Sequence, residues 1–259
     1  MEFPLLSLQR SKMNEQYNEL TNYIVELGKT IRSGSAIIVS EDGKDIKLNV
    51  DAEINKKIIS FLANKFPYPI LSEEEKNQIS FKKYNKKFWI IDPLDGSLNF
   101  SRNIPMSCIS IALFNDSKPN YGCIYDFNRN EIFIAEPNSC YLNGSRTMTS
   151  KIDRKSKGIL CTGFPSWRNY EDGSLIKFLD KIKNWKKIRA IGSAALSLTW
   201  VARGWADAYI EEDIRIWDVA AGLGLVLAAG GEIYLKENEQ PNFVTAIATN
   251  GKISVKDLL

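Results

Sequence analysis

Residues 88–97 read Phe88-Trp89-Ile90-Ile91-Asp92-Pro93-Leu94-Asp95-Gly96-Ser97, and this stretch decides how the rest of the sequence is interpreted. The four apolar residues at its start predict a buried strand, and two aspartates three residues apart follow where that strand is expected to end. Pro93 favours an extended backbone at Asp92, while Gly96 permits a sharp turn. The two carboxylates and the amide groups after them can then converge on one point, which suits a metal ion or a phosphate group. An ordinary turn capped by its aspartates is the alternative.

Acidic residues also stand at the ends of two other apolar segments. Glu73-Glu74-Glu75 follows Pro69-Ile70-Leu71-Ser72, and Asp218 precedes the small apolar run of residues 219–229. A carboxylate beside a buried element needs a partner. Taken singly, residues 73–75 also fit a solvated loop, and Asp218 fits a helix N-cap. The three acidic sites together favour a shared cation.

The composition excludes several classes of enzyme. The chain has 259 residues and no histidine, so Ser-His-Asp triads, His-ligated zinc sites and His general bases are excluded. With 44% hydrophobic residues it can bury a substantial core, in one domain or two tightly joined lobes. The four cysteines stand singly in apolar stretches, which predicts buried small side chains in a reducing compartment. They are Cys108, Cys123, Cys140 and Cys161.

The charge pattern argues against nucleic acid or a membrane as partner. The net charge is +3 and both signs are interspersed, so the lysine-rich stretches are interpreted as solvated surface. Residues 1–10 lack a signal pattern, and the longest uncharged apolar run, residues 219–231, is too short to span a bilayer. We therefore expect a cytoplasmic protein.

Apolar periodicity predicts an α/β (α+β) chain in two parts. Residues 1–150 are expected to form an α+β lobe that carries Glu73, Asp92 and Asp95, and residues 151–259 an α/β lobe that carries Asp218. The first lobe is predicted to have helices over 11–32 and from 51, then strands over 89–91, 108–114, 121–125 and 132–135. The second is predicted to have strands over 159–162, 187–190, 206–210, 232–235 and 244–248, and helices over 174–182, 194–203 and 218–229.

The motifs taken together resemble the inositol monophosphatase-like, magnesium-dependent, lithium-sensitive phosphatases. That family includes archaeal-type fructose-1,6-bisphosphatases and 3′-phosphoadenosine 5′-phosphate phosphatases. The resemblance rests on Asp45 with Asp51, Ser72-Glu73-Glu74, residues 89–100, Leu142-Asn143-Gly144, residues 189–195 and residues 217–222. It implies a layered αβαβα sugar-phosphatase fold with the active site between the lobes.

The resemblance also implies a set of metal ligands. Glu73, Asp92 and the Leu94 carbonyl would hold one ion, and Asp92, Asp95 and Asp218 a second. Clustered carboxylates without imidazole or thiolate suit Mg²⁺, with Mn²⁺ as a substitute. Two or three ions are expected, because Ser72 and Lys47-Leu48 depart from the family pattern near the third, weakest site. Lithium sensitivity is open for the same reason.

Further roles follow from the same resemblance. Glu73, Ser97 and Asp51 would position the attacking water, and the amides of Gly96 and Ser97 would bind phosphate oxygens. Substrate contacts would come from Gly192, Ser193, Ala194, Glu211 and Arg215. Ser193 is equally consistent with a helix N-cap, Glu211 with an exposed loop acid, and Arg215 with a salt bridge to Glu212 or Asp213.

The expected function is that of a Mg²⁺-dependent phosphoric monoester hydrolase. Inositol 1-phosphate or a related sugar or polyol phosphate would be the substrate, hydrolysed by a water molecule that the ions activate. Arg215 keeps fructose 1,6-bisphosphate as an alternative, with 3′-phosphoadenosine 5′-phosphate next. A metal-stabilised regulatory scaffold is the non-enzyme alternative. The resemblance also implies a homodimer.

Overall fold

The computed structural model describes residues 15–32, 38–42, 45–75, 79–165, 168 and 170–259, without the side chains of residues 32–49. The predicted helix over 11–32 is observed as α1 (Glu15–Arg32), and its first four residues lie outside the described part. The predicted helix from 51 begins slightly earlier, as α2 (Asn49–Lys65). A hairpin of β1 (Ile38–Asp42) and β2 (Asp45–Leu48) joins the two helices.

A seven-stranded sheet follows, in chain order from β3 to β9. Only its first pair, β3 with β4, is parallel, while every later neighbour is antiparallel. The strands are β3 (Ile70–Ser72), β4 (Phe88–Asp95), β5 (Cys108–Asn115), β6 (Lys118–Asp126), β7 (Glu131–Glu136), β8 (Ser139–Leu142) and β9 (Ser145–Thr147). The short helix α3 (Ser97–Ser101) comes directly after β4.

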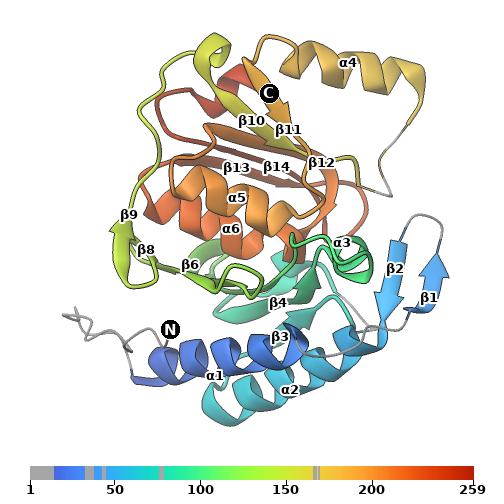
Figure 1. Cartoon of the computed structure of the whole chain (residues 1–259), viewed down its shortest axis with the longest axis vertical. Helices are drawn as coiled ribbons and strands as arrows, with labels where there is room; N and C mark the ends of the chain where they lie inside the picture. The colour runs from blue at the N-terminus through green and yellow to red at the C-terminus, as the bar shows by residue number, and fades with distance from the viewer. Residues whose placement is uncertain (1–14, 33–37, 43–44, 76–78, 166–167, 169) are drawn as a thin grey trace.

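The second sheet has five strands in the order β11-β10-β12-β14-β13. They are β10 (Ile159–Thr162), β11 (Lys187–Arg189), β12 (Ala208–Arg215), β13 (Glu232–Glu237) and β14 (Phe243–Thr249). Three helices accompany them: α4 (Asp172–Ile182), α5 (Ala194–Ala202) and α6 (Ile216–Ala228). Figure 1 shows the resulting layers, with α1 and α2, the larger sheet, α5 and α6, the smaller sheet and finally α4.

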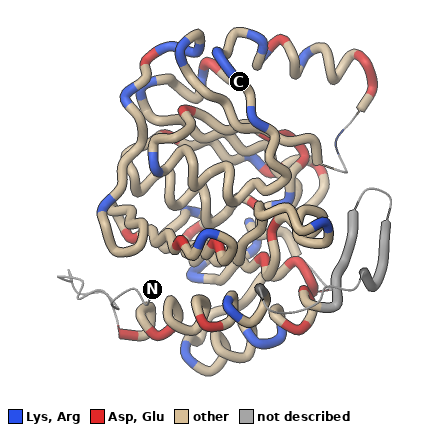
Figure 2. The backbone as a smooth tube through the Cα atoms, in the orientation of Figure 1, with Lys and Arg blue, Asp and Glu red and all other residues tan. Residues whose placement is uncertain are grey.

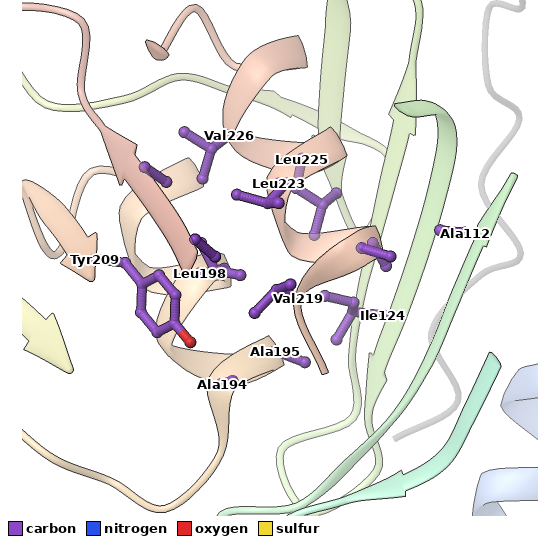
Figure 3. Close-up of a cluster of buried hydrophobic side chains, with 14 of the residues drawn as sticks. Ala112, Ile124, Ala194, Ala195, Leu198, Tyr209, Val219, Leu223, Leu225 and Val226 are labelled. Atoms are coloured by element: carbon purple, nitrogen blue, oxygen red, sulfur yellow. The ribbon is translucent and has the colours of Figure 1, made fainter. Parts of the chain in front are cut away.

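Three apolar cores hold these layers together. The first lies between the α1–α2 pair and one face of the larger sheet, where Leu20, Ile58 and Trp89 are buried. The second lies between the two sheets around α5 and α6. Figure 3 shows its Leu198, Val219 and Leu223 between Tyr209 and Ile124. The third lies between the smaller sheet and α4. These interfaces make the fold a layered αβαβα arrangement, as predicted.

Close contact between α5 and α6 depends on a glycine. A Cβ atom at Gly222 would lie 2.4 Å from the Cβ atom of Leu198, so a larger residue would push the two helices apart. The N-terminal ends of α5 and α6 belong to this middle layer. The packing of the two helices therefore fixes the positions of Ser193 and Asp218 relative to the larger sheet.

Most predicted segments are confirmed, and two strand ends were wrong by four or more residues. The strand predicted to end near Ile91 continues through Asp95. The strand predicted over 206–210 continues to Arg215, so α6 begins at Ile216. Asp218 is therefore in the first turn of α6 rather than at its N-cap. All four cysteines are free and buried, as predicted. No helix in the described part of the chain has both the length and the apolar character that a membrane span requires.

Figure 2 shows Lys and Arg spread over the molecule with Asp and Glu among them. The predicted division at residue 150 falls between the two sheets, since β9 ends at Thr147 and β10 begins at Ile159. The lobes share the core around α5 and α6. Their division stays a prediction.

Candidate active site

A β-bulge shapes the end of β4. Asp92 lies opposite Ser110 and Asp95 lies opposite Cys108, so three steps along β4 match two along β5. Pro93 falls inside this irregularity, where the ladder does not require an N–H group. The extra residue changes which way the following side chains face, and both aspartates are buried.

The bulge is continued by a tight turn. The Leu94 N–H donates to Asp92 Oδ1 at 3.0 Å, and Ser97 Oγ donates to the Leu94 carbonyl at 2.8 Å. Gly96 has φ of +83°, and a Cβ atom there would lie 2.5 Å from the Met106 carbonyl oxygen. A side chain at 96 is thus excluded both by conformation and by space. The turn brings the Ser97 hydroxyl to the Leu94 carbonyl, a predicted metal ligand.

Glu73 reaches Asp92 through the one parallel pair of the larger sheet. Ser72 of β3 pairs with Ile91 of β4, and the Glu73 N–H donates to the Ile91 carbonyl at 3.2 Å. Ser72 Oγ donates to Asn55 Oδ1 at 2.6 Å, which ties β3 to α2. The Glu73 side chain consequently forms a hydrogen bond with the Asp92 carboxyl group.

Asp95 is held by the second half of the chain. Its Oδ2 atom accepts hydrogen bonds from Ser193 Oγ and from the Ala195 N–H, the latter at 2.9 Å. Ser193 is also the N-cap of α5 and accepts from the Leu196 N–H at 3.2 Å, so the cap interpretation is confirmed. Cys108 Sγ donates to the same Asp95 oxygen at 3.7 Å.

Four carboxylates from separate elements influence one another at this junction. Burial raises the pKa of Asp92 well above its usual range, and the charges of Glu73, Asp95 and Asp218 raise it further. Burial also raises the pKa of Asp218, with added repulsion from Glu73 and Asp95 and partial relief from Arg215. The acids therefore lie close enough to repel, without enough positive charge nearby to balance them.

Asp95 is the best compensated of these acids. Its pKa is raised to about 6, because burial raises it by more than the hydrogen bonds from Ser193 and from the Ala194 and Ala195 amides lower it. Hydrogen bonds from the protein thus stabilise the ionised carboxylate of Asp95 in part, but ionisation remains unfavourable without a cation.

The donor set fits a hard divalent cation by its chemistry. It consists of buried carboxylates next to a backbone carbonyl, and oxygen ligands of this kind suit Mg²⁺. Among the described residues, no group of three or more Asp, Glu, Cys or His side chains is already arranged to hold a metal ion. The ligand assignments stay predictions.

Glu211 is not an exposed loop acid. It lies in β12 with 5% of its surface exposed, and a Cβ atom at Gly163 would come within 1.9 Å of its Oε1 atom. Its pKa is raised to about 8, mainly by burial and also by the Asp95 charge, while the Arg168 charge lowers it in part. Glu211 is consequently a buried acid within electrostatic reach of Asp95.

Arg215, at the end of β12, packs on aromatic rings. Its guanidinium carbon is 3.7 Å from the centre of the Phe243 ring and 5.2 Å from that of Trp217. Glu212, one of its predicted partners, forms ion pairs with Arg168 at 2.9 Å and Lys181 at 2.8 Å. The Arg215 charge lowers the pKa of Asp218, which places Arg215 near the carboxylates.

Asp51 and Asp45 stand further back in the sequence. Asp51 is buried in the first turn of α2, a helix that packs against β4. The backbone of Asp45 begins β2, and its side chain lies outside the described residues. The role predicted for Asp51 beside Ser97 stays a prediction.

Comparison with known proteins identifies the family. The family model described as "Inositol monophosphatase family" matches residues 12–252. The chain belongs to the inositol monophosphatase family. Members of this family are metal-dependent phosphatases that act on small phosphate esters.

Two relatives and two solved structures illustrate the similarity. The inositol-1-monophosphatase of Synechocystis is 32% identical over 90% of this chain and 84% of its own length. The Nus factor SuhB of Xylella fastidiosa is 36% identical over 76% of this chain and 71% of its own length. Among solved structures, suhB of Bartonella henselae has a TM-score of 0.79 at 29% identity, covering 91% of this chain and 94% of that one. The IMPase of Thermotoga maritima has a TM-score of 0.78 at 25% identity, covering 94% and 95%.

Three residues around the site were given no role from the sequence. Arg168 lies within electrostatic reach of Glu211, Cys108 contacts Asp95, and Asn99 contacts the loop before α5. Cys108 lies opposite Asp95 only because of the register of β5, which no local pattern reveals. Asn99 belongs to the family motif of residues 89–100, and its place in that motif was the sequence signal for a role at the site.

Proposed function

We propose that the chain is a Mg²⁺-dependent phosphomonoesterase that hydrolyses inositol 1-phosphate or a related sugar or polyol phosphate. One observation carries the proposal. Glu73 follows β3 directly, Asp92 and Asp95 lie in β4 and Asp218 lies in α6, and the charges of the other three acids raise the pKa of Asp92. A buried group of carboxylates that repel one another is unfavourable in a protein without a cation to bind.

In this proposal the ligands are divided between two ions. Glu73, Asp92 and the Leu94 carbonyl would hold one, and Asp92, Asp95 and Asp218 would hold the other. When bound, Mg²⁺ supplies charge neutralisation for the phosphate and lowers the pKa of a coordinated water. Asp92 belongs to both sets, so it is the residue on which the pair depends most.

The chain's own groups orient the reactants. Glu73 and the Ser97 hydroxyl, which the Leu94 carbonyl holds in place, position the attacking water. Amide groups of Gly96 and Ser97 bind phosphate oxygens and stabilise the charge that develops on them. Glu211 accepts a hydrogen bond from a substrate hydroxyl. With no histidine in the chain, no imidazole takes part in proton transfer.

A panel of phosphate esters tests the proposal. The purified protein is incubated with inositol 1-phosphate, fructose 1,6-bisphosphate, 3′-phosphoadenosine 5′-phosphate and p-nitrophenyl phosphate, with Mg²⁺ or with EDTA, and released phosphate is measured. We expect Mg²⁺-dependent release, fastest from inositol 1-phosphate. The absence of release from every ester would contradict the proposal. The proposal also includes a homodimer, which sedimentation of the same sample measures.

A bisphosphate substrate is the second candidate. Arg215 favours it, because its guanidinium lies near Asp218 and carries a charge that a second phosphate would need. A regulatory scaffold is the non-enzyme candidate, since several relatives bear the name Nus factor SuhB. Phosphate release in the panel separates both enzyme candidates from the scaffold.

A further inference from the structure

One side-chain amide links the two halves of the candidate active site. Asn99 Nδ2 donates to the carbonyl oxygens of Met106 at 2.9 Å, Ile191 at 2.8 Å and Gly192 at 3.1 Å. Asn99 lies in α3, four residues after Asp95. The carbonyls of residues 191 and 192 come from the segment that leads into α5, over ninety positions away.

The contact is closely fitted. Gly192 has φ of +71°, and a Cβ atom there would lie 3.0 Å from Asn99 Nδ2 and 3.2 Å from its Oδ1. A larger residue at 192 would be strained by conformation and would crowd the amide. The amide nitrogen has two hydrogens for three carbonyl oxygens, so both of its donors are used.

A second tie fixes the other end of the same segment. The Asp95 carboxylate accepts from Ser193 Oγ and from the Ala195 N–H. Residues 191–195 are therefore attached to the motif of residues 92–99 at two points. One attachment is Asp95, a predicted metal ligand, and the other is Asn99, which is outside the predicted ligand set. Asn99 can thus be changed without removing a ligand.

We propose that Asn99 is a positioning residue that sets residues 191–195 against the metal motif and thereby determines affinity for the alcohol part of the substrate. This inference rests on the proposed function, in which residues 192–194 contact that alcohol. Without the amide, three carbonyl oxygens lose their common donor, and residues 191 and 192 keep the apolar packing of Ile191 and the indirect restraint through Asp95. Asn99 is half-buried, so water can replace the lost donor and the fold is retained.

Hydrogen exchange tests the restraint without reference to activity. In metal-free protein, Asn99→Ala is expected to speed exchange of backbone amides in residues 190–197 by about tenfold. The matched control is Ser101→Ala in the same short helix, because Ser101 Oγ bonds only locally, to the Leu98 carbonyl at 2.8 Å. The control should leave exchange in residues 190–197 unchanged. Unchanged exchange in Asn99→Ala would overturn the inference.

Kinetics test the consequence for substrate. Asn99→Ala is expected to raise KM for inositol 1-phosphate by about tenfold. For p-nitrophenyl phosphate, both kcat and KM should stay within about threefold of the values of the unmodified protein. An equal rise of KM for both esters would mean a general structural role and would overturn the inference. If the unmodified protein hydrolyses neither ester, the proposed function fails, and the exchange experiment still decides whether Asn99 restrains the segment.

A second variant guards against misfolding. Asn99→Ser keeps a polar group at the position, but its shorter side chain cannot span the carbonyls of residues 106 and 191. We expect the same exchange and KM changes as for Asn99→Ala, and a variant that matches the unmodified protein in both would contradict the proposal.

Discussion

Replacing Asp92 by asparagine should stabilise the metal-free protein and abolish most of its activity. The effect on stability follows from the charges around this residue. Burial and the carboxylates of Glu73, Asp95 and Asp218 all raise the pKa of Asp92. Its ionised form is therefore less favourable in the folded protein than in the unfolded chain. The asparagine side chain of the variant carries no charge, so this repulsion is removed.

The scale follows from the general cost of a buried charge without a compensating partner, which is on the order of 3 kcal/mol. We therefore expect Asp92→Asn to raise the free energy of unfolding at pH 8 by ~2–3 kcal/mol without metal. For a chain of this size, that is a rise in Tm of roughly 5–10 °C.

The gain should depend on pH with a definite sign. The folded protein retains protons that the unfolded chain releases above about pH 4, so the unmodified protein loses stability as pH rises from about 4 through the raised pKa values. Below about pH 4 the group is protonated in both states, and the advantage of the variant disappears. Melting curves in EDTA at pH 4 and pH 8 measure this difference.

The same variant should lose its response to metal. Mg²⁺ is expected to raise the Tm of the unmodified protein and to leave that of Asp92→Asn nearly unchanged. Turnover should fall by about three orders of magnitude or more, equivalent to ~4 kcal/mol in the barrier. Mg²⁺-dependent turnover within tenfold of normal, or a lower Tm at pH 8 in EDTA, would refute the reasoning.

Asp126→Asn is the matched control. Asp126 is also buried with its pKa raised to about 6, and it lies outside the predicted ligands. Its Oδ1 accepts the N–H groups of Asn128 and Arg129, both at 3.0 Å. The same reasoning predicts that this control also gains stability at pH 8, by less than Asp92→Asn because two N–H groups already bind its carboxylate, while its activity and its response to Mg²⁺ stay unchanged.

Three further predictions address the substrate and the metal. Gly163→Ala places a Cβ atom 1.9 Å from the present position of Glu211 Oε1, so the Glu211 carboxylate must move. KM for inositol 1-phosphate should then rise about tenfold, while turnover of p-nitrophenyl phosphate changes little. Equal effects on both esters would count against a substrate role for Glu211. The affinity for Mg²⁺, measured by calorimetry, should increase as pH rises through about 6, because Asp95 must be ionised to bind the ion. An affinity that does not change between pH 5 and 8 would contradict the assignment of Asp95 as a ligand. Arg215→Ala should depress turnover of fructose 1,6-bisphosphate at least tenfold and spare inositol 1-phosphate if Arg215 binds a second phosphate, whereas equal losses would assign it to packing on Phe243.

Local sequence was sufficient for most helices and strands and for the type of chemistry, while the layered arrangement was implied by the family resemblance. Apolar residues at three- and four-residue steps predicted α1 and α2, and alternating short segments predicted the strands, because each pattern depends on neighbours within a few positions. The acids at 73, 92, 95 and 218 indicated a cation, and the lack of histidine excluded whole classes of mechanism. Even so, the end of β4 was misplaced, since the bulge at Pro93 lets the strand continue where a turn was expected.

Tertiary structure alone decided how those acids meet and what holds them. The bond from Asn99 to Ile191 spans 92 positions and the bond from Ser193 to Asp95 spans 98, so neither leaves a periodic trace in the sequence. Cys108 meets Asp95 through strand register, and Glu211 is buried because Gly163 leaves room for its carboxylate. Such contacts depend on how two sheets stack across the α5–α6 layer. Local sequence patterns specify which faces are apolar, and the packing of those faces determines which polar groups meet at the edge.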